Sequence, residues 1–447
     1  MKSNYIMDLG ALAEKNNKIL PSLYGKYEVK RGFRNSNGTG VLVGLTEIGD
    51  VHGYIMDEGE RIPVEGKLRY RGIDVGEMST GFLAEGRFGF EECVYLLLFG
   101  ELPTQHDLEK FNSLLGLSRD LPENFLEDMI LKAPSNDIMN KLARSVLALY
   151  SYDDNPDDTS IVNIVRQSIE LIARVPALIS YGYQAKSYHY LNQSLVIHTP
   201  YPELSTAENL LKMSRDSAEY TAMEAEILDL LLVLHAEHGG GNNSAFTAHV
   251  VSSSGTDIYS AIAAAVGSLK GPRHGGANIK VSGMMREIKS NVADWSNESE
   301  VRDYLIRILR KEAFDRSGLI YGMGHAVYTK SDPRCEILKE KARELARETG
   351  RIEEFELYSS IESLSPLVFQ EIKDNGKDMA ANVDFYSGFV YEMLGIPKDL
   401  FTPLFAASRI AGWCAHIIEE IQNGGRIIRP AYKNVSSRAI YTPITER

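Results

Sequence analysis

The strongest constraint on the fold is the spacing of apolar residues, which recur about every 3.6 residues over long stretches of the chain. Glycine or Gly-Pro follows many of these stretches, where helices are expected to end. Strand signals are sparse, and residues 52–75 are the best candidate for a short hairpin. The pattern therefore predicts an all-α fold. The helical stretches are residues 90–102, 137–152, 160–185, 218–238, 299–314 and 332–348.

A change in charge along the chain indicates two domains. Residues from about 280 to 375 are much more charged than the helices before them, which is typical of solvated amphipathic helices. We interpret this part as an insertion: a small helical domain at residues 277–384, and a large helical domain made of residues 1–276 and 385–447. Two such domains imply a cleft between them, where small ligands prefer to bind.

The composition excludes several classes of function. The chain has 447 residues and a formal net charge of −13, so we expect no binding to nucleic acid or to an anionic membrane. The cysteines Cys93, Cys335 and Cys414 are far apart, which argues against a disulfide scaffold or a zinc ribbon. The polar start is no signal peptide, and no apolar run is long enough to span a bilayer. We therefore expect a cytoplasmic protein.

Four histidines lie beside glycine in three separate stretches. Glycine lets the backbone approach a ligand closely, and a helix end offers unpaired backbone groups. Helix capping alone would explain the glycines but not the repeated histidine. A metal site is the alternative for the first two histidines, but their stretch is not HExxH and no cysteine is near, so we expect no metal. The four are His235 and His238 in "LHAEHGGGNNS", His274 in "GPRHGGAN" and His325 in "GMGHAVYTK".

Charged residues complete a possible anion site. Arg334 follows His325 by nine residues, Asp384 precedes an aromatic-rich helix, and Arg429 lies in the tail. Arg409 stands in the middle of an otherwise apolar helix, where an arginine is costly to bury without an anionic partner. Arginines suit the carboxylates of a small polycarboxylate, and a carboxylate base with histidine donors suits proton removal next to a carbonyl.

Five motifs together resemble the citrate synthase family, in their order and spacing. The resemblance runs from about "GKLRYRGIDV" to "IIRPAY". It implies an all-α enzyme whose large domain forms a homodimer and whose small domain lies on the CoA side and closes over the cleft. It also implies condensation of oxaloacetate with an acyl-CoA, as in the tricarboxylic acid cycle. The motifs are "LHAEHGGGNNSAF", "LKGPRHGGAN", "GMGHAVYTKSDPR", "NVDFYSG" and "SRIAGW".

The resemblance assigns a role to each motif residue. Asp384 resembles the base that takes a proton from the acetyl methyl group. His274 resembles the donor to the thioester oxygen of the enolate, and such a donor is worth roughly 10²–10³ in rate. His325 resembles the donor to the oxaloacetate carbonyl. The residues resembling binders of oxaloacetate or citrate are His238, Arg334, Arg409 and, from the neighbouring subunit, Arg429; those resembling the CoA site are Gly322, Met323, Gly324 and Lys330.

Two departures from the family pattern bear on the substrate. Ala380 and Ala381 replace the usual Tyr-Pro before "NVD", which puts the acyl-CoA preference in doubt. Arg273 stands where leucine is common, and it could pair with a CoA phosphate or with an acid on the small domain.

We expect a citrate synthase of the Si type that uses oxaloacetate, acetyl-CoA and water, with no cofactor and no metal. One alternative is 2-methylcitrate synthesis from propionyl-CoA, the same chemistry on a longer acyl group. A second is a helical protein that binds CoA or dicarboxylates without turnover.

Overall fold

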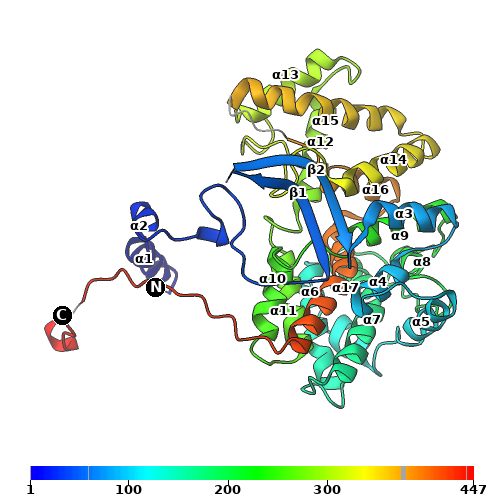
Figure 1. Cartoon of the computed structure of the whole chain (residues 1–447), viewed down its shortest axis with the longest axis horizontal. Coiled ribbons are helices and arrows are strands. Elements are labelled where there is room, and N and C mark those ends of the chain that lie inside the picture. Colours follow the sequence, from blue (N-terminus) through cyan, green and yellow to red (C-terminus); the bar gives the residue numbers. More distant parts are fainter. Residues whose placement is uncertain (1, 59, 374–378, 439) are drawn as a thin grey trace. The chain divides into compact units, whose positions relative to one another are not determined.

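The structure is a computed structural model that describes residues 2–58, 60–373, 379–438 and 440–447 (Figure 1). Its contacts divide it into two compact units. The first comprises Met1–Leu45 and Tyr54–Val64, and the second comprises Thr46–Gly53 and Glu65–Arg447. The first unit contains helices α1 (Lys2–Asn16) and α2 (Pro21–Lys26), whose described side chains are mostly exposed. All the predicted site residues belong to the second unit.

The strands that the structure describes form one three-stranded sheet in the order β1-β2-β3. They are β1 (Gly49–Asp57), β2 (Glu60–Tyr70) and β3 (Ile73–Asp74). β2 pairs antiparallel with β3, with Arg69 opposite Asp74. The short sheet predicted at residues 52–75 is therefore confirmed, and it begins three residues earlier than expected.

Outside the sheet, the regular secondary structure of the second unit is helical, which confirms the all-α prediction. Most helices begin at a side-chain cap, such as Asp74, Thr104, Asp137, Ser205 or Thr221. The helices are α3 (Val75–Ala84), α4 (Phe90–Phe99), α5 (Gln105–Leu117), α6 (Ile138–Leu149), α7 (Ile161–Leu191), α8 (Thr206–Ser214), α9 (Ala222–His235), α10 (Asn243–Ser252), α11 (Ile258–Leu269), α12 (Ala277–Asn291), α13 (Glu298–Leu309), α14 (Pro333–Glu348), α15 (Ile352–Lys373), α16 (Val383–Met393) and α17 (Phe401–Gln422).

Helix α17 is the centre of the core. It contacts α4, α6, α7, α9, α10 and α11, which surround it in Figure 1. Every residue from Phe401 to Ile417 is buried. A polar residue on this helix therefore lies among packed side chains, and Arg409 and His416 are both in this position.

The charged stretch after residue 276 forms helices that pack on one another. α13 and α14 contact α15, α12 contacts α13, and α16 packs against both α12 and α14. Their polar faces carry ion pairs such as Lys289–Glu354 at 2.6 Å and Lys339–Glu362 at 2.6 Å. This confirms the amphipathic helices, whereas the domain boundaries at 277 and 384 remain a prediction. None of the described helices combines the length and the apolar character needed to cross a membrane.

Candidate active site

His274 lies in the corner between α11 and α12, and its ring faces the N-terminus of α10. The backbone N–H of Ser244 donates to His274 Nε2 at 3.3 Å, and the Ser244 hydroxyl oxygen lies 2.9 Å from the same nitrogen. Because a backbone N–H can only donate, Nε2 is unprotonated and the ring proton is on Nδ1. Burial, followed by the positive charge of Arg409, lowers the pKa of His274 to about 4. The ring is therefore neutral at pH 7, with Nδ1–H as its donor.

Ser244 is a site residue that the sequence interpretation missed. Its hydroxyl accepts a hydrogen bond from the indole Nε1–H of Trp413 on α17 at 3.1 Å. It also lies 3.0 Å from Oδ1 of Asn242, the N-cap residue of α10. The signal in the sequence was this asparagine, because an N-cap fixes where the free N–H groups of the first turn point.

His325 lies in the loop before α14, where two backbone groups fix its ring. The N–H groups of Val327 and Tyr328 each donate to His325 Nδ1 at 3.1 Å. In a neutral ring the proton is then on Nε2, so Nε2–H is the donor. The ring stacks on Tyr328 with centroids 4.8 Å apart, and it meets the ring of His238 edge-on at 5.0 Å.

His238 follows α9 and lies beside His325. Burial, and then the positive charges of Arg334 and of nearby groups, hold the pKa of His238 well below its usual value. Its Nε2 is buried and has no hydrogen-bond partner among the described residues. A buried polar atom without a partner is costly, so this nitrogen is suited to meet a ligand.

Arg334 forms a buried, two-pronged ion pair with Asp332. Its Nε donates to Asp332 Oδ1 at 3.0 Å and its Nη2 to Oδ2 at 2.7 Å. Burial disfavours the charged guanidinium, but Asp332 outweighs burial and raises the pKa of Arg334. Asp332 also caps α14 and accepts the backbone N–H of Val383 at 3.3 Å, so it links the first turns of α14 and α16. The sequence interpretation missed Asp332, because it assigned a role only to Arg334 in the stretch "SDPR".

Arg409 lies in the middle of α17 and is 1 % exposed. Its Nε donates to the carbonyl of His235 at 2.6 Å, and its guanidinium lies 4.7 Å from the ring centroid of Phe405. Among the described residues, no carboxylate comes within 4.0 Å of this guanidinium to form a direct ion pair. Burial lowers the pKa of Arg409 to about 10, which still leaves it charged. The site thus holds a buried positive charge that an anionic ligand could meet.

Asp384 lies in the first turn of α16, next to the Asp332–Arg334 pair. The N-cap residue Asn382 accepts its backbone N–H at 3.0 Å. Burial raises the pKa of the Asp384 carboxyl to about 6, and the charges of Arg334 and Arg409 limit this rise. A carboxyl with a pKa near 6 is ionised at pH 7 and is a stronger base than an ordinary aspartate.

The stretch Gly322–Met323–Gly324 runs beside Ala380–Ala381. The N–H of Gly324 donates to the Ala380 carbonyl at 2.7 Å, and Met323 pairs with Ala381 in an antiparallel bridge. Gly322 has φ = 78°, and a Cβ there would lie 2.8 Å from the Phe385 side chain. Glycine is therefore required for this close approach. The sequence departure at Ala380–Ala381 lies directly against the predicted CoA-binding stretch.

Three predicted site residues are exposed. Lys330 follows the His325 loop, Arg429 lies in the irregular tail after α17, and Arg273 precedes His274. Arg273 forms no ion pair with a described acidic residue, so pairing with an acid on the helices α12–α15 is not seen. No described contact joins Arg429 to the other site residues within one chain.

Comparison with known proteins decides the family. A family model described as "Citrate synthase, C-terminal domain" matches residues 37–431, which is most of the chain. The chain belongs to the citrate synthase family. Members of this family transfer an acyl group in the condensation of acetyl-CoA with oxaloacetate, so the family and the enzyme class expected from the five motifs are confirmed.

Relatives within the citrate synthase family cover nearly the whole chain. A citrate synthase from Haloferax volcanii is 32 % identical over 94 % of this chain and 99 % of its own length. A 2-methylcitrate synthase from Shewanella oneidensis is 33 % identical over 85 % of this chain and 92 % of its own. The ternary complex of citrate synthase from Thermoplasma acidophilum with carboxymethyl coenzyme A and oxaloacetate has a TM-score of 0.73 and 26 % identity, covering 94 % and 99 % of the two chains. These matches support an enzyme and not the non-catalytic alternative.

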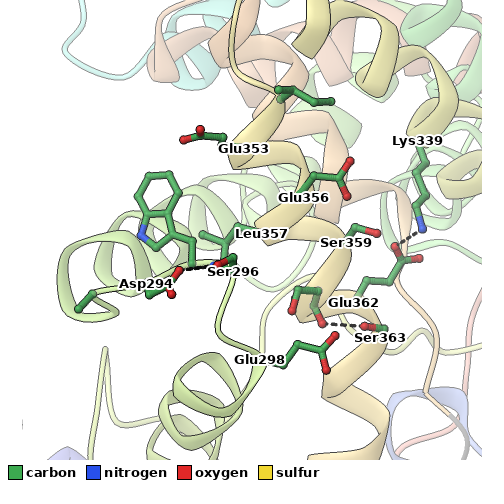
Figure 2. A pocket seen from close by; sticks show the side chains of 14 residues that line it. Asp294, Ser296, Glu298, Lys339, Glu353, Glu356, Leu357, Ser359, Glu362 and Ser363 are labelled. Carbon is green, nitrogen blue, oxygen red and sulfur yellow. Dashed lines mark hydrogen bonds and ion pairs between the residues drawn. The ribbon is translucent and has the colours of Figure 1, made fainter.

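The large hollow beside α15 is not the citrate synthase site. This cavity of about 1130 Å³ lies between α15 and the residues that lead into α13, and it contains none of the predicted site residues (Figure 2). Carboxylates dominate its lining, and they would repel oxaloacetate and the CoA phosphates. The acidic lining residues are Asp294, Glu298, Glu353, Glu356 and Glu362.

The structure bears on the metal alternative only through its described residues. Within them, no three or more His, Cys, Asp or Glu side chains gather in a way that could hold a metal ion. His235 is buried, and its Nδ1 donates to the Leu231 carbonyl at 2.9 Å. In this citrate synthase family member, His235 and His238 thus have separate surroundings, with His235 inside the core and His238 beside His325.

Proposed function

We propose that this enzyme condenses oxaloacetate with acetyl-CoA and water to give citrate and CoA. One observation carries the proposal: backbone N–H groups donate to one nitrogen of His274 and to one of His325, so a neutral ring carries its proton on the other nitrogen. Each of the two reacting carbonyl groups gains negative charge during the reaction. Two hydrogen-bond donors that the backbone holds in position before the reaction can stabilise the negative charge on both oxygens.

The first step in this proposal is the removal of a proton from the acetyl methyl group by Asp384. A thioester α-proton is far less acidic than a carboxylic acid, so the base cannot act without stabilisation of the enolate. His274 donates from Nδ1 to the thioester oxygen as its charge grows. A neutral donor suits this role because it does not give up its proton before the C–C bond forms.

The second step is attack of the enolate on the oxaloacetate ketone. His325 donates from Nε2 to the ketone oxygen, which becomes the hydroxyl of the product. Arg409, His238 and Arg334 hold the oxaloacetate carboxylates. No described carboxylate forms a direct ion pair with Arg409, which supports its role, whereas Arg334 keeps Asp332 as a fixed partner and adds positive charge.

The CoA portion would lie along Gly322, Met323 and Gly324, with Lys330 at its rim. The exposed position of Arg273, one residue before His274, favours pairing with a CoA phosphate over an internal ion pair. Domain closure, with residues 277–384 moving against the rest, would keep water from the enolate until condensation is complete. Hydrolysis of the citryl thioester then releases CoA.

The working enzyme in this proposal is a homodimer in the cytoplasm that needs no cofactor and no metal. Arg429 would reach the active site of the neighbouring subunit, because it is exposed in the irregular tail and no described contact joins it to the site residues of its own chain. The titrated release of CoA thiol from acetyl-CoA and oxaloacetate tests the function directly.

A second candidate is 2-methylcitrate synthesis from propionyl-CoA. Two observations favour keeping it: the small side chains of Ala380 and Ala381 beside the CoA-binding stretch, and relatives named 2-methylcitrate synthase. One methylene is worth about 1–3 kcal/mol in a hydrophobic pocket, so kcat/KM for the two thioesters should differ by about 10- to 200-fold.

A further inference from the structure

Arg409 is a buried cation whose charge must be balanced at a distance. Arg334 has a carboxylate of Asp332 at 2.7 Å, but Arg409 has no described carboxylate within ion-pair distance. The pKa of Arg409 is lowered first by burial and raised by Glu237. The positive charge of Arg334 then lowers it further, because the two guanidinium groups repel each other. An uncompensated charge in this position would be costly before substrate binds.

Glu237 is the buried carboxylate that most favours the charged form of Arg409. It is 0 % exposed and stands two residues after His235, whose carbonyl accepts the Nε–H of Arg409. Burial alone would raise the pKa of Glu237, but His416 and then Arg409 outweigh burial and lower it. Glu237 is therefore ionised, and its charge acts on Arg409 without a direct contact.

Two glycines and a histidine pack around the Glu237 side chain. A Cβ at Gly49 would lie 2.8 Å from Glu237 Cγ, and a Cβ at Gly412 would clash with Glu237 Oε2. On the other side, His416 Nε2 donates to Glu237 Oε1 at 3.0 Å. Gly412 follows Arg409 by three residues and His416 follows by seven, so all three lie on one face of α17.

One oxygen of this carboxylate has no ordinary structural use. Oε2 of Glu237 is buried and has no hydrogen-bond partner among the described residues. A neutral glutamine could keep the hydrogen bond from His416 and fill the same space. The charge of Glu237 acts first on His416, its ion-pair partner at 3.0 Å, and then on Arg409, which has no described carboxylate within ion-pair distance.

We propose that Glu237 is a positioning residue that acts through Arg409: it is the internal counter-charge of that arginine until a substrate carboxylate takes over this role. The part that concerns substrate rests on the proposed function, in which Arg409 binds oxaloacetate. When the dicarboxylate binds, Glu237 weakens the interaction because like charges then share the same buried region. Glu237 thus stabilises the empty site and limits the affinity of the filled one.

The counter-charge is tested by thermal unfolding of the full-length enzyme without substrate. Glu237→Gln should lower Tm, and Glu237→Gln combined with Arg409→Met should unfold at a higher temperature than Glu237→Gln alone, since the uncompensated charge is gone. A double variant that is no more stable than Glu237→Gln, or that fails to fold while Arg409→Met folds, would overturn the proposal. If Glu237→Gln alone does not fold, a folded double variant supports the proposal, and a double variant that does not fold overturns it.

The effect on substrate is tested by titrating oxaloacetate into the wild type and Glu237→Gln. The expected result is about tenfold tighter binding by the variant, because a negative charge next to Arg409 is removed. At one fixed oxaloacetate concentration, the variant should also gain a larger increase in Tm than the wild type. A loss of packing alone would lower the Tm of the variant without enlarging the increase in Tm that oxaloacetate causes. An increase equal to that of the wild type, or smaller, would therefore overturn the proposal.

Asp229→Asn is the control for packing and hydrogen bonding, because burial raises the pKa of Asp229 well above its usual value, so this change tests packing and not charge. Asp229 is another buried carboxylate, and it accepts the N–H groups of Gly89 and Phe90 at 2.6 and 3.2 Å. This variant should lower Tm and keep the oxaloacetate-induced increase of the wild type. If oxaloacetate does not bind the wild type at all, the proposed function fails, whereas the substrate-free Tm comparison still decides the pairing of Glu237 with Arg409.

Discussion

His274 and His325 present their ring protons on opposite nitrogens. Backbone N–H groups hold Nε2 of His274 and Nδ1 of His325 as acceptors, which leaves Nδ1–H of the first ring and Nε2–H of the second as donors. His274 and His325 are 51 residues apart in the chain, and neighbouring backbone N–H groups donate to one ring nitrogen of each. Burial, followed by the positive charge of Arg409, lowers the pKa of His274 to about 4, which keeps this ring a neutral donor at pH 7.

Removal of the first donor tests the enolate step. His274→Ala should lower kcat by roughly 10²–10³ while oxaloacetate binding stays close to that of the wild type, because the lost donor serves the transition state. Single-turnover kinetics with acetyl-CoA and calorimetry with oxaloacetate measure the two quantities. Equal losses in oxaloacetate affinity and rate would show that His274 holds that substrate instead.

The pKa of Asp384 predicts the acid side of the pH profile. The base must be ionised, and burial raises the pKa of this carboxyl to about 6, so kcat/KM should fall about tenfold per pH unit below that value. Asp384→Ala should abolish condensation and leave oxaloacetate binding nearly intact. A profile that stays flat down to pH 5, or activity that survives in the variant, would mean that another group is the base.

The same raised pKa makes a prediction about stability. The folded protein holds the Asp384 proton up to a higher pH than the unfolded chain does, so this group favours folding at low pH. That contribution is lost as the pH rises from about 4 to about 6. Asp384→Asn should therefore be more stable than the wild type at pH 8, as measured by Tm, and the advantage should vanish near pH 4.

Arg409→Leu tests the anion site. The change removes the buried guanidinium and should weaken oxaloacetate binding by at least about tenfold, the loss expected for one charge-assisted hydrogen bond of about 1.5–3 kcal/mol. The KM for acetyl-CoA at saturating oxaloacetate should change much less. Isothermal titration and steady-state kinetics give both numbers, and an unchanged oxaloacetate affinity would place the carboxylate elsewhere.

Much of the fold follows from local patterns in the sequence. The apolar spacing predicted the helices that became α7, α9 and α14, and the isolated arginine in "SRIAGW" predicted a buried charge on α17. α1 could not be predicted in this way, since its described side chains from residue 5 onward are exposed and show no buried face.

The partners within the site depended on tertiary contacts that no local pattern shows. Ser244 reaches His274 across 30 residues because α10 begins beside the α11–α12 corner. Asp332 reads as an ordinary N-cap before proline, and only the packing of α14 against α16 brings it to Asp384. Glu237 lies between two histidines in "LHAEHGGGNNSAF", yet its surroundings depend on Gly412 and His416 from a helix that is distant in sequence.

Mixed dimers test the contribution of Arg429 to the neighbouring subunit. Arg429→Ala and Asp384→Ala should each be nearly inactive as pure proteins. Co-expression of the two chains should restore one complete site per mixed dimer, with the base from one chain and the arginine from the other. Specific activity of the purified mixed dimer is the readout, and a value no higher than that of the pure variants would contradict a shared site.

The most direct test of the account is free-thiol release by the purified enzyme with saturating oxaloacetate and either acetyl-CoA or propionyl-CoA. The account predicts oxaloacetate-dependent release of CoA thiol, with the higher kcat/KM for acetyl-CoA and with citrate as the product. A higher kcat/KM for propionyl-CoA would move the enzyme to 2-methylcitrate synthesis with the same site chemistry. No oxaloacetate-dependent thiol release with either thioester would contradict the account.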